Sequence, residues 1–273
     1  MNGLKSALEI LEETSRTFYI PIIRLPPNLQ EAVASAYLCM RAIDEIEDHP
    51  TLENGVKSHI LSQMSWGLQS GVNNSTLAQT RLDWGVYESE IPEVSLRLYD
   101  WATLAPEDIS PRIWDATAAM ANRMAAWAEC NWNVLTERDL DCYTFSVAGA
   151  VGLMLSDLWA WYDGTQTNRM EAIAFGRGLQ AVNILRNHHE DLQRGVDFFP
   201  QDWTSVQMQA YARRNLELAN QYTESLPPGP ALEFCKIPLA LAHATLEVLQ
   251  TGEEKLSRTA VLTLIQQLTS YNN

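Results

Sequence analysis

Apolar residues recur at spacings of three and four along nearly the whole chain, and strict alternation over the length of a strand is hard to find. This spacing matches the 3.6-residue period of an α-helix and not the two-residue period of a strand. The prolines fall where such helices should begin or end. The pattern therefore predicts an all-α protein.

Four of the predicted helices are the best marked. They cover about residues 27–48, 136–158 and 168–194, together with a stretch that begins at residue 108 or 110 and runs through 124. Gly149 and Gly152 interrupt the helix over 136–158, and glycine lowers helix propensity. We therefore expect something to approach the backbone closely at these two positions.

The segments between the predicted helices are short. They lie at residues 49–56, 70–76, 88–93, 163–168 and 226–230, and none resembles a domain linker. The 273 residues are 46% hydrophobic, so the chain can bury a sizeable core. We expect one domain over residues 1–273, with one or two final helices after residue 231.

The charge balance restricts the class of partner. Asp and Glu number 34 against 19 Lys and Arg, which gives a formal net charge of −15. Such a protein repels phosphate backbones, so a nucleic-acid binder that works by counterion release is excluded. An anionic substrate would need metal ions between itself and the protein.

Cysteines and apolar runs indicate where the protein resides. Cys39, Cys130, Cys142 and Cys235 form no C-x-x-C pair and have no metal-finger spacing, which is typical of reduced and mostly buried thiols. The first 16 residues lack the apolar core of a signal peptide. No run of about 18 uncharged apolar residues occurs. We expect a cytoplasmic protein without a transmembrane segment.

Two polar stripes interrupt otherwise apolar helices. The first, in the helix over 27–48, has spacings of four, three and four, and the second, in the helix over 168–194, has spacings of three, four and four. Each spacing places its residues on one helix face. The first stripe consists of Tyr37, Arg41, Asp44 and Asp48, with Glu45 and Glu47 off its face, and the second of Gln180, Asn183, Asn187 and Asp191.

A solvated acidic surface is the ordinary interpretation of such stripes. Three features favour a metal site instead: neutral amides and a tyrosine are included, the arrangement occurs twice, and Asp44 and Asp48 repel each other unless a cation lies between them. Few hard oxygen ligands on rigid helices suit Mg²⁺ that bridges to substrate phosphates. The nine tryptophans fit either core packing or an aromatic-lined apolar pocket.

Motif spacing excludes other kinds of metal, nucleotide-binding or hydrolase site. A di-iron bundle needs E-x-x-H on its helices, and no P-loop, G-x-G-x-x-G or G-x-S-x-G motif occurs. His188 and His189 are consecutive, so they point about 100° apart on a helix and cannot chelate as a pair. We expect both to be surface residues.

Four stretches carry a family likeness. They are SRTFYIPIIRLPP (15–27), AYLCMRAIDEIED (36–48), DCYTFSVAGAVG (141–152) and LQAVNILRNHHEDLQRG (179–195). In order and spacing the chain resembles the squalene/phytoene synthase family, the head-to-head prenyltransferases of the all-α isoprenoid synthase fold. The likeness covers roughly residues 10–200. It implies a helical bundle around a central apolar cavity.

The resemblance also implies roles for individual residues. Asp44 and Asp48 resemble the first aspartate motif and Asn187 and Asp191 the second, with Asn183 as a further Mg²⁺ ligand. Arg41 and Arg186 resemble the residues that hold diphosphate. Ser15 and Arg16 resemble the segment that closes over the diphosphate, and Tyr37 and Gln180 lie in the same implied cavity. Tyr143 resembles the tyrosine that steers the carbocation. The small residues implied beside the prenyl chain are Val147, Ala148, Gly149 and Gly152.

Three functions are consistent with this set. The first is Mg²⁺-dependent head-to-head condensation of two farnesyl or geranylgeranyl diphosphates, with NADPH as an optional reductant and peripheral membrane contact for product release. The second is a prenyl diphosphate phosphatase that releases the alcohol, and the third is a non-catalytic relative. Asn187 stands where the family usually has Asp, which removes one charge from the second motif. Oligomeric state is not readable from the sequence.

Overall fold

The computed structural model describes residues 2–71, 73–252 and 255–270, without the side chains of Asn2, Arg16 and Ser270. Within those ranges every regular element is a helix, so the all-α prediction is confirmed. By its internal contacts the chain divides into two compact units, residues 1–132 and 133–273. The single domain over residues 1–273 stays a prediction.

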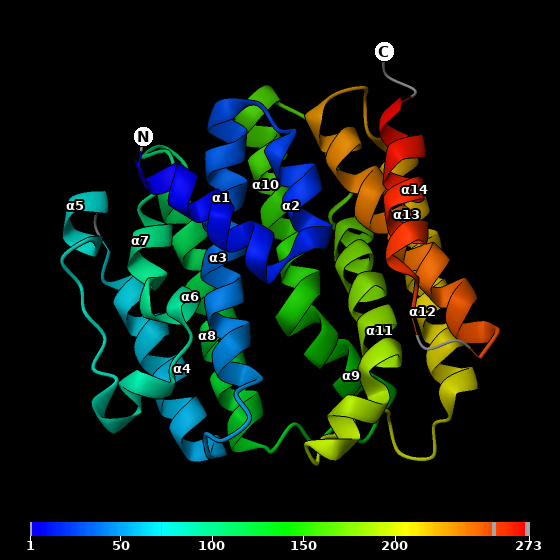
Figure 1. Cartoon of the computed structure of the whole chain (residues 1–273), viewed down its shortest axis with the longest axis horizontal. Helices are drawn as coiled ribbons and strands as arrows, with labels where there is room; N and C mark the ends of the chain where they lie inside the picture. Colours follow the sequence, from blue (N-terminus) through cyan, green and yellow to red (C-terminus); the bar gives the residue numbers. More distant parts are fainter. Residues whose placement is uncertain (1, 72, 253–254, 271–273) are drawn as a thin grey trace. The chain divides into compact units, whose positions relative to one another are not determined.

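The N-terminal unit is built around three long helices. α4 packs along α8, and α3 packs against α8, α7 and α6 (Figure 1). The elements of this unit are α1 (Asn2–Thr14), α2 (Arg16–Ile23), α3 (Pro27–Glu47), α4 (Asn54–Gln69), α5 (Asn74–Leu77), the 3₁₀ helix Gly85–Glu90, α6 (Glu93–Leu96), α7 (Leu98–Ala102) and α8 (Ser110–Glu129). Leu38, Ile43, Leu61 and Met124 are fully buried and form part of its core.

The C-terminal unit surrounds the longest helix, α11. α12, α10 and α13 pack against it, and α11, α12 and α13 lie side by side in Figure 1. The elements are α9 (Glu137–Thr144), a π-helical turn (Phe145–Gly149), α10 (Ala150–Asp163), α11 (Arg169–Gln193), α12 (Ser205–Ser225), α13 (Pro230–Gln250) and α14 (Arg258–Ser270). The two final helices after residue 229 agree with the prediction for the tail.

The boundaries of the predicted helices follow from local capping. Asn168 accepts hydrogen bonds from the backbone N–H groups of Met170 and Glu171 and so begins α11. Thr136 forms a capping box with Asp139 at the start of α9. The predicted helix over 136–158 is a helical run that extends to Asp163, because the left-handed Gly164 ends it. The sequence pattern did not show the π-helical turn inside this run.

Two predictions about apolar and thiol side chains are partly wrong. Of the free cysteines, Cys39 and Cys235 are buried, but Cys130 and Cys142 are exposed. Trp132 and Trp159 are buried as core residues, whereas Trp66 is 62% exposed. Helical periodicity predicts which face is apolar, but it does not predict how completely a neighbouring element covers that face.

One helical run of the described residues, Glu137–Asp163, is long and apolar enough to cross a membrane by length and composition. Its most apolar window has a mean hydropathy of 1.2 and is 44% buried. Core helices of globular proteins meet the same criterion, and α10 packs against α11 within its unit. The run is weak support for a membrane span, so the absence of a transmembrane segment stays a prediction.

Candidate active site

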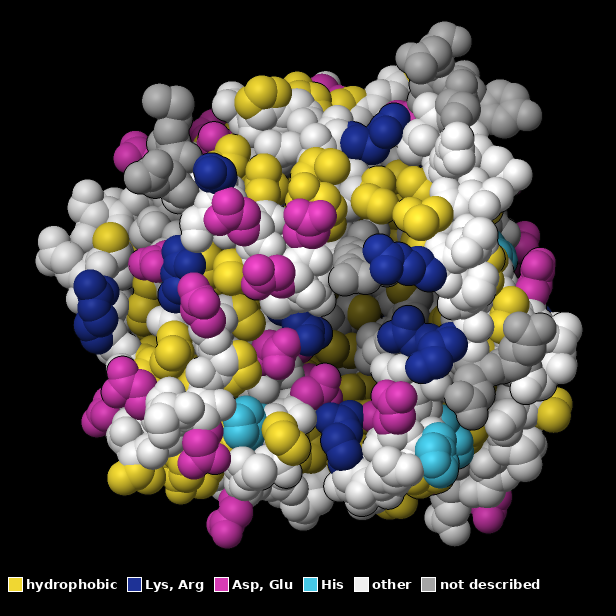
Figure 2. Space-filling model, viewed as in Figure 1, with side chains coloured by type: hydrophobic (Ala, Val, Ile, Leu, Met, Phe, Trp, Pro, Cys, Tyr) yellow, Lys and Arg dark blue, Asp and Glu magenta, His cyan; other side chains and the backbone are white. Residues whose placement is uncertain are grey.

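The predicted polar stripe of α3 lies on one side of that helix, in the N-terminal unit. Tyr37, Arg41 and Asp44 are half-buried, and Asp48 is exposed at the end of the helix, where its backbone N–H donates to the carbonyl of Asp44. Acidic side chains gather over the part of this unit formed by α1 and α3 in Figure 2. The stripe thus places two carboxylates one helical turn apart, beside a guanidinium and a phenol.

Asp44 is electrostatically strained. Its Oδ1 atom is buried and accepts no hydrogen bond from the described residues. The pKa of Asp44 is raised to about 7, chiefly by burial; Arg41 opposes this rise, and the carboxylates of Asp48 and Glu45 add to it. A buried carboxylate oxygen without a donor is unfavourable unless a cation or a proton compensates it.

The donor set of α3 therefore fits a hard divalent cation. Asp44 supplies a buried oxygen without a hydrogen-bond donor among the described residues, and Asp48 supplies a second carboxylate on the next turn. Within the described ranges, His, Cys, Asp and Glu form no group of three or more that could hold a metal. A cation at this position would complete its shell with water and substrate phosphate oxygens, as Mg²⁺ commonly does.

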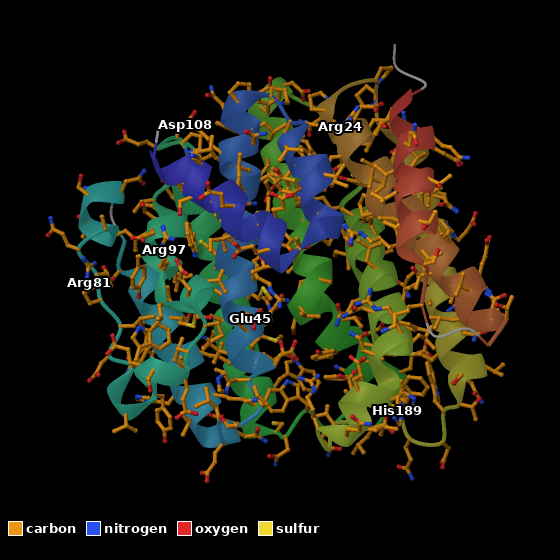
Figure 3. All side chains as sticks on the ribbon, viewed as in Figure 1. Arg24, Glu45, Arg81, Arg97, Asp108 and His189 are labelled. Carbon is orange, nitrogen blue, oxygen red and sulfur yellow. The ribbon has the colours of Figure 1, made fainter. Side chains whose placement is uncertain are left out.

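Glu45 lies closer to the stripe than its sequence position indicated. We predicted it off the face, but it forms an ion pair with Arg41 because residues four apart are neighbours on a helix. Burial lowers the pKa of Arg41, but the negative charges of Asp44 and Glu45 outweigh it, so the pKa is raised. Figure 3 marks Glu45 on α3. Arg41 is thus paired with Glu45 at the centre of the stripe, and the charge of Asp44 also acts on it.

Tyr37 connects the stripe to the start of α2. The Ser15 side chain caps α2 by accepting a hydrogen bond from the backbone N–H of Phe18 at 3.5 Å, and it also hydrogen-bonds Tyr37. Burial raises the pKa of Tyr37 to about 12, so the phenol stays protonated. Phe18 lies against Tyr37, with 5.4 Å between ring centroids. Arg16 begins α2, but its side chain is outside the described part of the structure.

Buried polar groups that we did not predict fix the last turn of α3. The ammonium of Lys57 donates to the backbone carbonyl of Glu47 at 2.6 Å, and the indole N–H of Trp132 donates to the Glu47 carboxylate at 3.1 Å. Lys57 also lies 5.2 Å from the centroid of the Trp132 ring. All three residues are buried. The turn that carries Asp48 is consequently anchored from two sides.

The polar stripe of α11, in the C-terminal unit, is internally bonded. The side-chain oxygen of Asn183 accepts from Arg186 at 2.6 Å and from the Asn187 amide at 3.3 Å, and Arg186 also donates to the Asn187 oxygen at 3.1 Å. The buried Asp191 accepts from Arg194 at 2.5 Å. The oxygens predicted to ligate a metal thus have cationic or amide donors already. Their metal role, and the substrate role of the half-buried Gln180, stay predictions.

Tyr143 lies buried at the C-terminal end of α9. Its ring stacks on Phe198, with centroids 4.4 Å apart and planes at 18°. The next residue, Phe199, stacks on His188 at 3.8 Å, and Asp197 contacts the same imidazole at 3.2 Å. His188 is therefore half-buried, which corrects the prediction of a surface residue, because the chain folds back over this side of α11. His189, marked in Figure 3, is exposed as predicted.

The glycines of the helical run from α9 to α10 allow α11 to approach. A Cβ atom on Gly152 would lie 2.0 Å from the carbonyl oxygen of Ala172, and one on Gly176 would lie 2.1 Å from that of Ala148. The predicted close approach is confirmed, and its partner is the α11 backbone. Val147, Ala148 and Gly149 occupy the π-helical turn, a feature frequent at functional sites. Their contact with a prenyl chain stays a prediction.

Known proteins resemble this chain over most of its length. The family described as "Squalene/phytoene synthase" matches residues 11–209. Squalene synthase of Dictyostelium discoideum is 32% identical over 87% of this chain and 55% of its own length, and squalene synthase ERG9 of Candida albicans is 30% identical over 87% and 60%. The chain belongs to the squalene/phytoene synthase family, and it spans less than two thirds of the length of these two relatives.

Solved structures give the same fold. A TcSQS complex superposes with a TM-score of 0.80 at 23% identity, covering 98% of this chain and 86% of that one. A dehydrosqualene synthase gives a TM-score of 0.65 at 18% identity, covering 99% and 96%. The fold is thus the all-α isoprenoid synthase fold that the resemblance implied.

Proposed function

We propose that this chain is a prenyltransferase that condenses two prenyl diphosphates head to head and releases diphosphate. Membership of the squalene/phytoene synthase family supports a prenyl diphosphate as substrate. The relatives at about 30% identity are squalene synthases, which favours farnesyl diphosphate and a squalene-type product over a phytoene-type product. The same relatives favour condensation over hydrolysis to a prenyl alcohol.

The observation that carries the proposal is the buried carboxylate oxygen of Asp44, which accepts no hydrogen bond from the described residues, on the same helix face as Arg41. Ionisation of an allylic diphosphate requires positive charge around the departing diphosphate. Arg41, which pairs with Glu45, supplies one such charge from the protein. Mg²⁺ held by Asp44 and Asp48 would supply further charge to the leaving group and let a protein of net charge −15 bind an anion.

The apolar residues have a complementary task. After diphosphate leaves, the allylic cation must be kept from water until the second prenyl chain reaches it. Tyr143, stacked on Phe198, presents a buried aromatic ring of the kind that stabilises a cation through its π face. We propose that Tyr143 and the residues of the π-helical turn contact the prenyl chains, and that Arg186 contacts diphosphate.

Product identification tests this function. The full chain is incubated with farnesyl or geranylgeranyl diphosphate and Mg²⁺, with and without NADPH. We expect a hydrocarbon or a cyclopropylcarbinyl intermediate with twice the carbon number of the substrate. Prenyl alcohol as the sole product would establish the phosphatase, and no turnover by folded protein would indicate a non-catalytic relative. A product that changes only when NADPH is present would show that the nicotinamide reduces the intermediate.

A further inference from the structure

A short segment after α11 is tied to both of its neighbours. In this segment, residues 195–201, the backbone N–H of Val196 donates to the carbonyl of Asp191 at 3.0 Å, and the backbone N–H of Gln201 donates to the carbonyl of Leu135 at 3.0 Å. The left-handed Gly195, with φ of +79°, turns the chain away from the helix axis. The segment therefore runs from the end of the second motif to the start of α9.

Two aromatic side chains of this segment are buried. Phe198 and Phe199 are each 6% exposed, and the carboxylate of Asp197 accepts a hydrogen bond from the Phe199 backbone N–H at 2.9 Å. Phe199 covers His188 on α11, whereas Phe198 covers Tyr143 on α9. A loop with both ends bonded and two buried rings has little freedom to move independently of the helices that it joins.

The contact between Phe198 and Tyr143 restricts the tyrosine more than ordinary apolar packing would. The centroid distance of 4.4 Å and the interplanar angle of 18° define a stack, in which one face of the Tyr143 ring is covered. Rotation of the phenol out of its plane would require Phe198 to move. The direction of the Tyr143 ring is thus set by the segment whose other end is bonded to Asp191.

We propose that Phe198 is a positioning residue that holds the Tyr143 ring in place for the carbocation. The inference rests on the proposed function, and it concerns what happens after diphosphate has left. Without the stack, the ring samples more directions and shields the cation from water less well. The loss should therefore appear in the fate of the cation and not in its formation.

The first experiment measures product partition. Phe198→Leu keeps an apolar side chain but removes the ring, so we expect diphosphate release within about threefold of wild type and a prenyl alcohol share raised about tenfold. Phe198→Tyr retains a ring and should restore the wild-type ratio. Phe175→Leu is the matched control, because Phe175 is another buried phenylalanine of the same unit, in edge contact with Tyr222 at 5.8 Å. An equal change of ratio in this control would overturn the assignment.

A double-mutant comparison establishes whether Phe198 acts through Tyr143. If it does, Phe198→Leu should leave the product ratio unchanged in a Tyr143→Leu background, because the ring that Phe198 positions is already absent there. An effect of undiminished size in the Tyr143→Leu background would mean that Phe198 acts independently of Tyr143. That outcome would contradict the positioning role.

A spectroscopic measurement separates this inference from the proposed function. The ring resonances of Tyr143, assigned by their loss in Tyr143→Phe, should move in Phe198→Leu because the ring current of the stacked partner is gone. Unmoved resonances would overturn the inference whatever the enzyme makes. Moved resonances in a protein that turns over neither farnesyl nor geranylgeranyl diphosphate would establish the stack. In that case the proposed function and the catalytic purpose of the stack would both be wrong.

Discussion

Arg194 donates to the carboxylate of Asp191 at 2.5 Å, one helical turn further along the end of α11. The side chain of Asp191 is 8% exposed and that of Arg194 is 36% exposed, so the acid is buried and its partner reaches solvent. A buried carboxylate needs such a partner far more than an exposed one does. Asp191, whatever its role toward a metal, is therefore supported by a cation of the chain itself.

Removal of the Arg194 guanidinium should lower the stability of the fold. We expect Arg194→Ala to lower the free energy of unfolding by about 1–3 kcal/mol, because the buried Asp191 carboxylate loses its ion pair with Arg194. Lys236→Ala is the matched control: Lys236 pairs with Glu233 at the same spacing of three residues, but both side chains are more than a third exposed. Its loss should stay below about 1 kcal/mol. Equal losses in chemical denaturation would show that Asp191 does not depend on Arg194.

Lack of space at Gly152 gives a second stability test. Gly152→Ala should lower the free energy of unfolding by about 1–3 kcal/mol or prevent folding, since its Cβ would lie 2.0 Å from the Ala172 carbonyl oxygen. The control is Gly55→Ala in α4, where nothing lies within 4 Å of the new methyl group. That change should be stabilising by about 0.5–1 kcal/mol through helix propensity. If Gly152→Ala were as stable as Gly55→Ala, the close packing of α10 against α11 would be contradicted.

The anchor at the end of α3 should affect metal dependence. Trp132→Phe removes the indole N–H that donates to the Glu47 carboxylate, but it keeps an aromatic ring beside Lys57. We therefore expect this variant to need a several-fold higher Mg²⁺ concentration for half-maximal turnover. Trp114→Phe, the control, loses a similar buried bond in the same unit, from the indole to the Ala102 carbonyl at 2.9 Å. Both should lose about 1–2 kcal/mol of stability. The idea fails if the two variants need the same Mg²⁺ concentration.

The pKa of Asp44 predicts how stability depends on pH. Because burial raises it to about 7, between about pH 4 and 7 the folded protein holds a proton that the unfolded chain has lost. Protonation of Asp44 therefore stabilises the folded state most below about pH 4, and this stabilisation declines from pH 4 and is lost above about pH 7. Asp44→Asn cannot ionise, so in metal-free buffer its stability relative to wild type should rise from pH 4 to pH 8, by on the order of 1–3 kcal/mol. The exposed Asp115→Asn on α8 should show no such trend.

Local patterns predicted the helices and the two polar stripes, because the spacing of side chains on a helix depends only on nearby sequence. Tyr37, Arg41 and Asp44 could be grouped in this way. The partners of those stripes could not be predicted, since Trp132 is 85 positions away from the Glu47 carboxylate that it bonds. Periodicity gives a face but not what covers it. For the same reason the Phe198 stack became apparent only in the fold.

The glycines mark the limit of the sequence argument. Their cost to helix propensity correctly indicated a close approach, but the approaching group at Gly152 could have been a substrate or a neighbouring helix. The structure assigns it to α11. Asn183 and Asp191 of α11 show a similar limit. Their types and spacing can be read from the sequence, but the hydrogen bonds that they accept from Arg186 and Arg194 cannot.

The stoichiometry of diphosphate release tests the central claim most directly. Joining two prenyl diphosphates into a hydrocarbon loses both diphosphates, whereas hydrolysis loses one for each alcohol formed. With farnesyl diphosphate, Mg²⁺ and NADPH, we predict two diphosphates for each hydrocarbon product, and loss of both signals in a folded Asp44→Ala variant. Diphosphate matched one to one by prenyl alcohol, or full activity without the Asp44 carboxylate, would contradict the account.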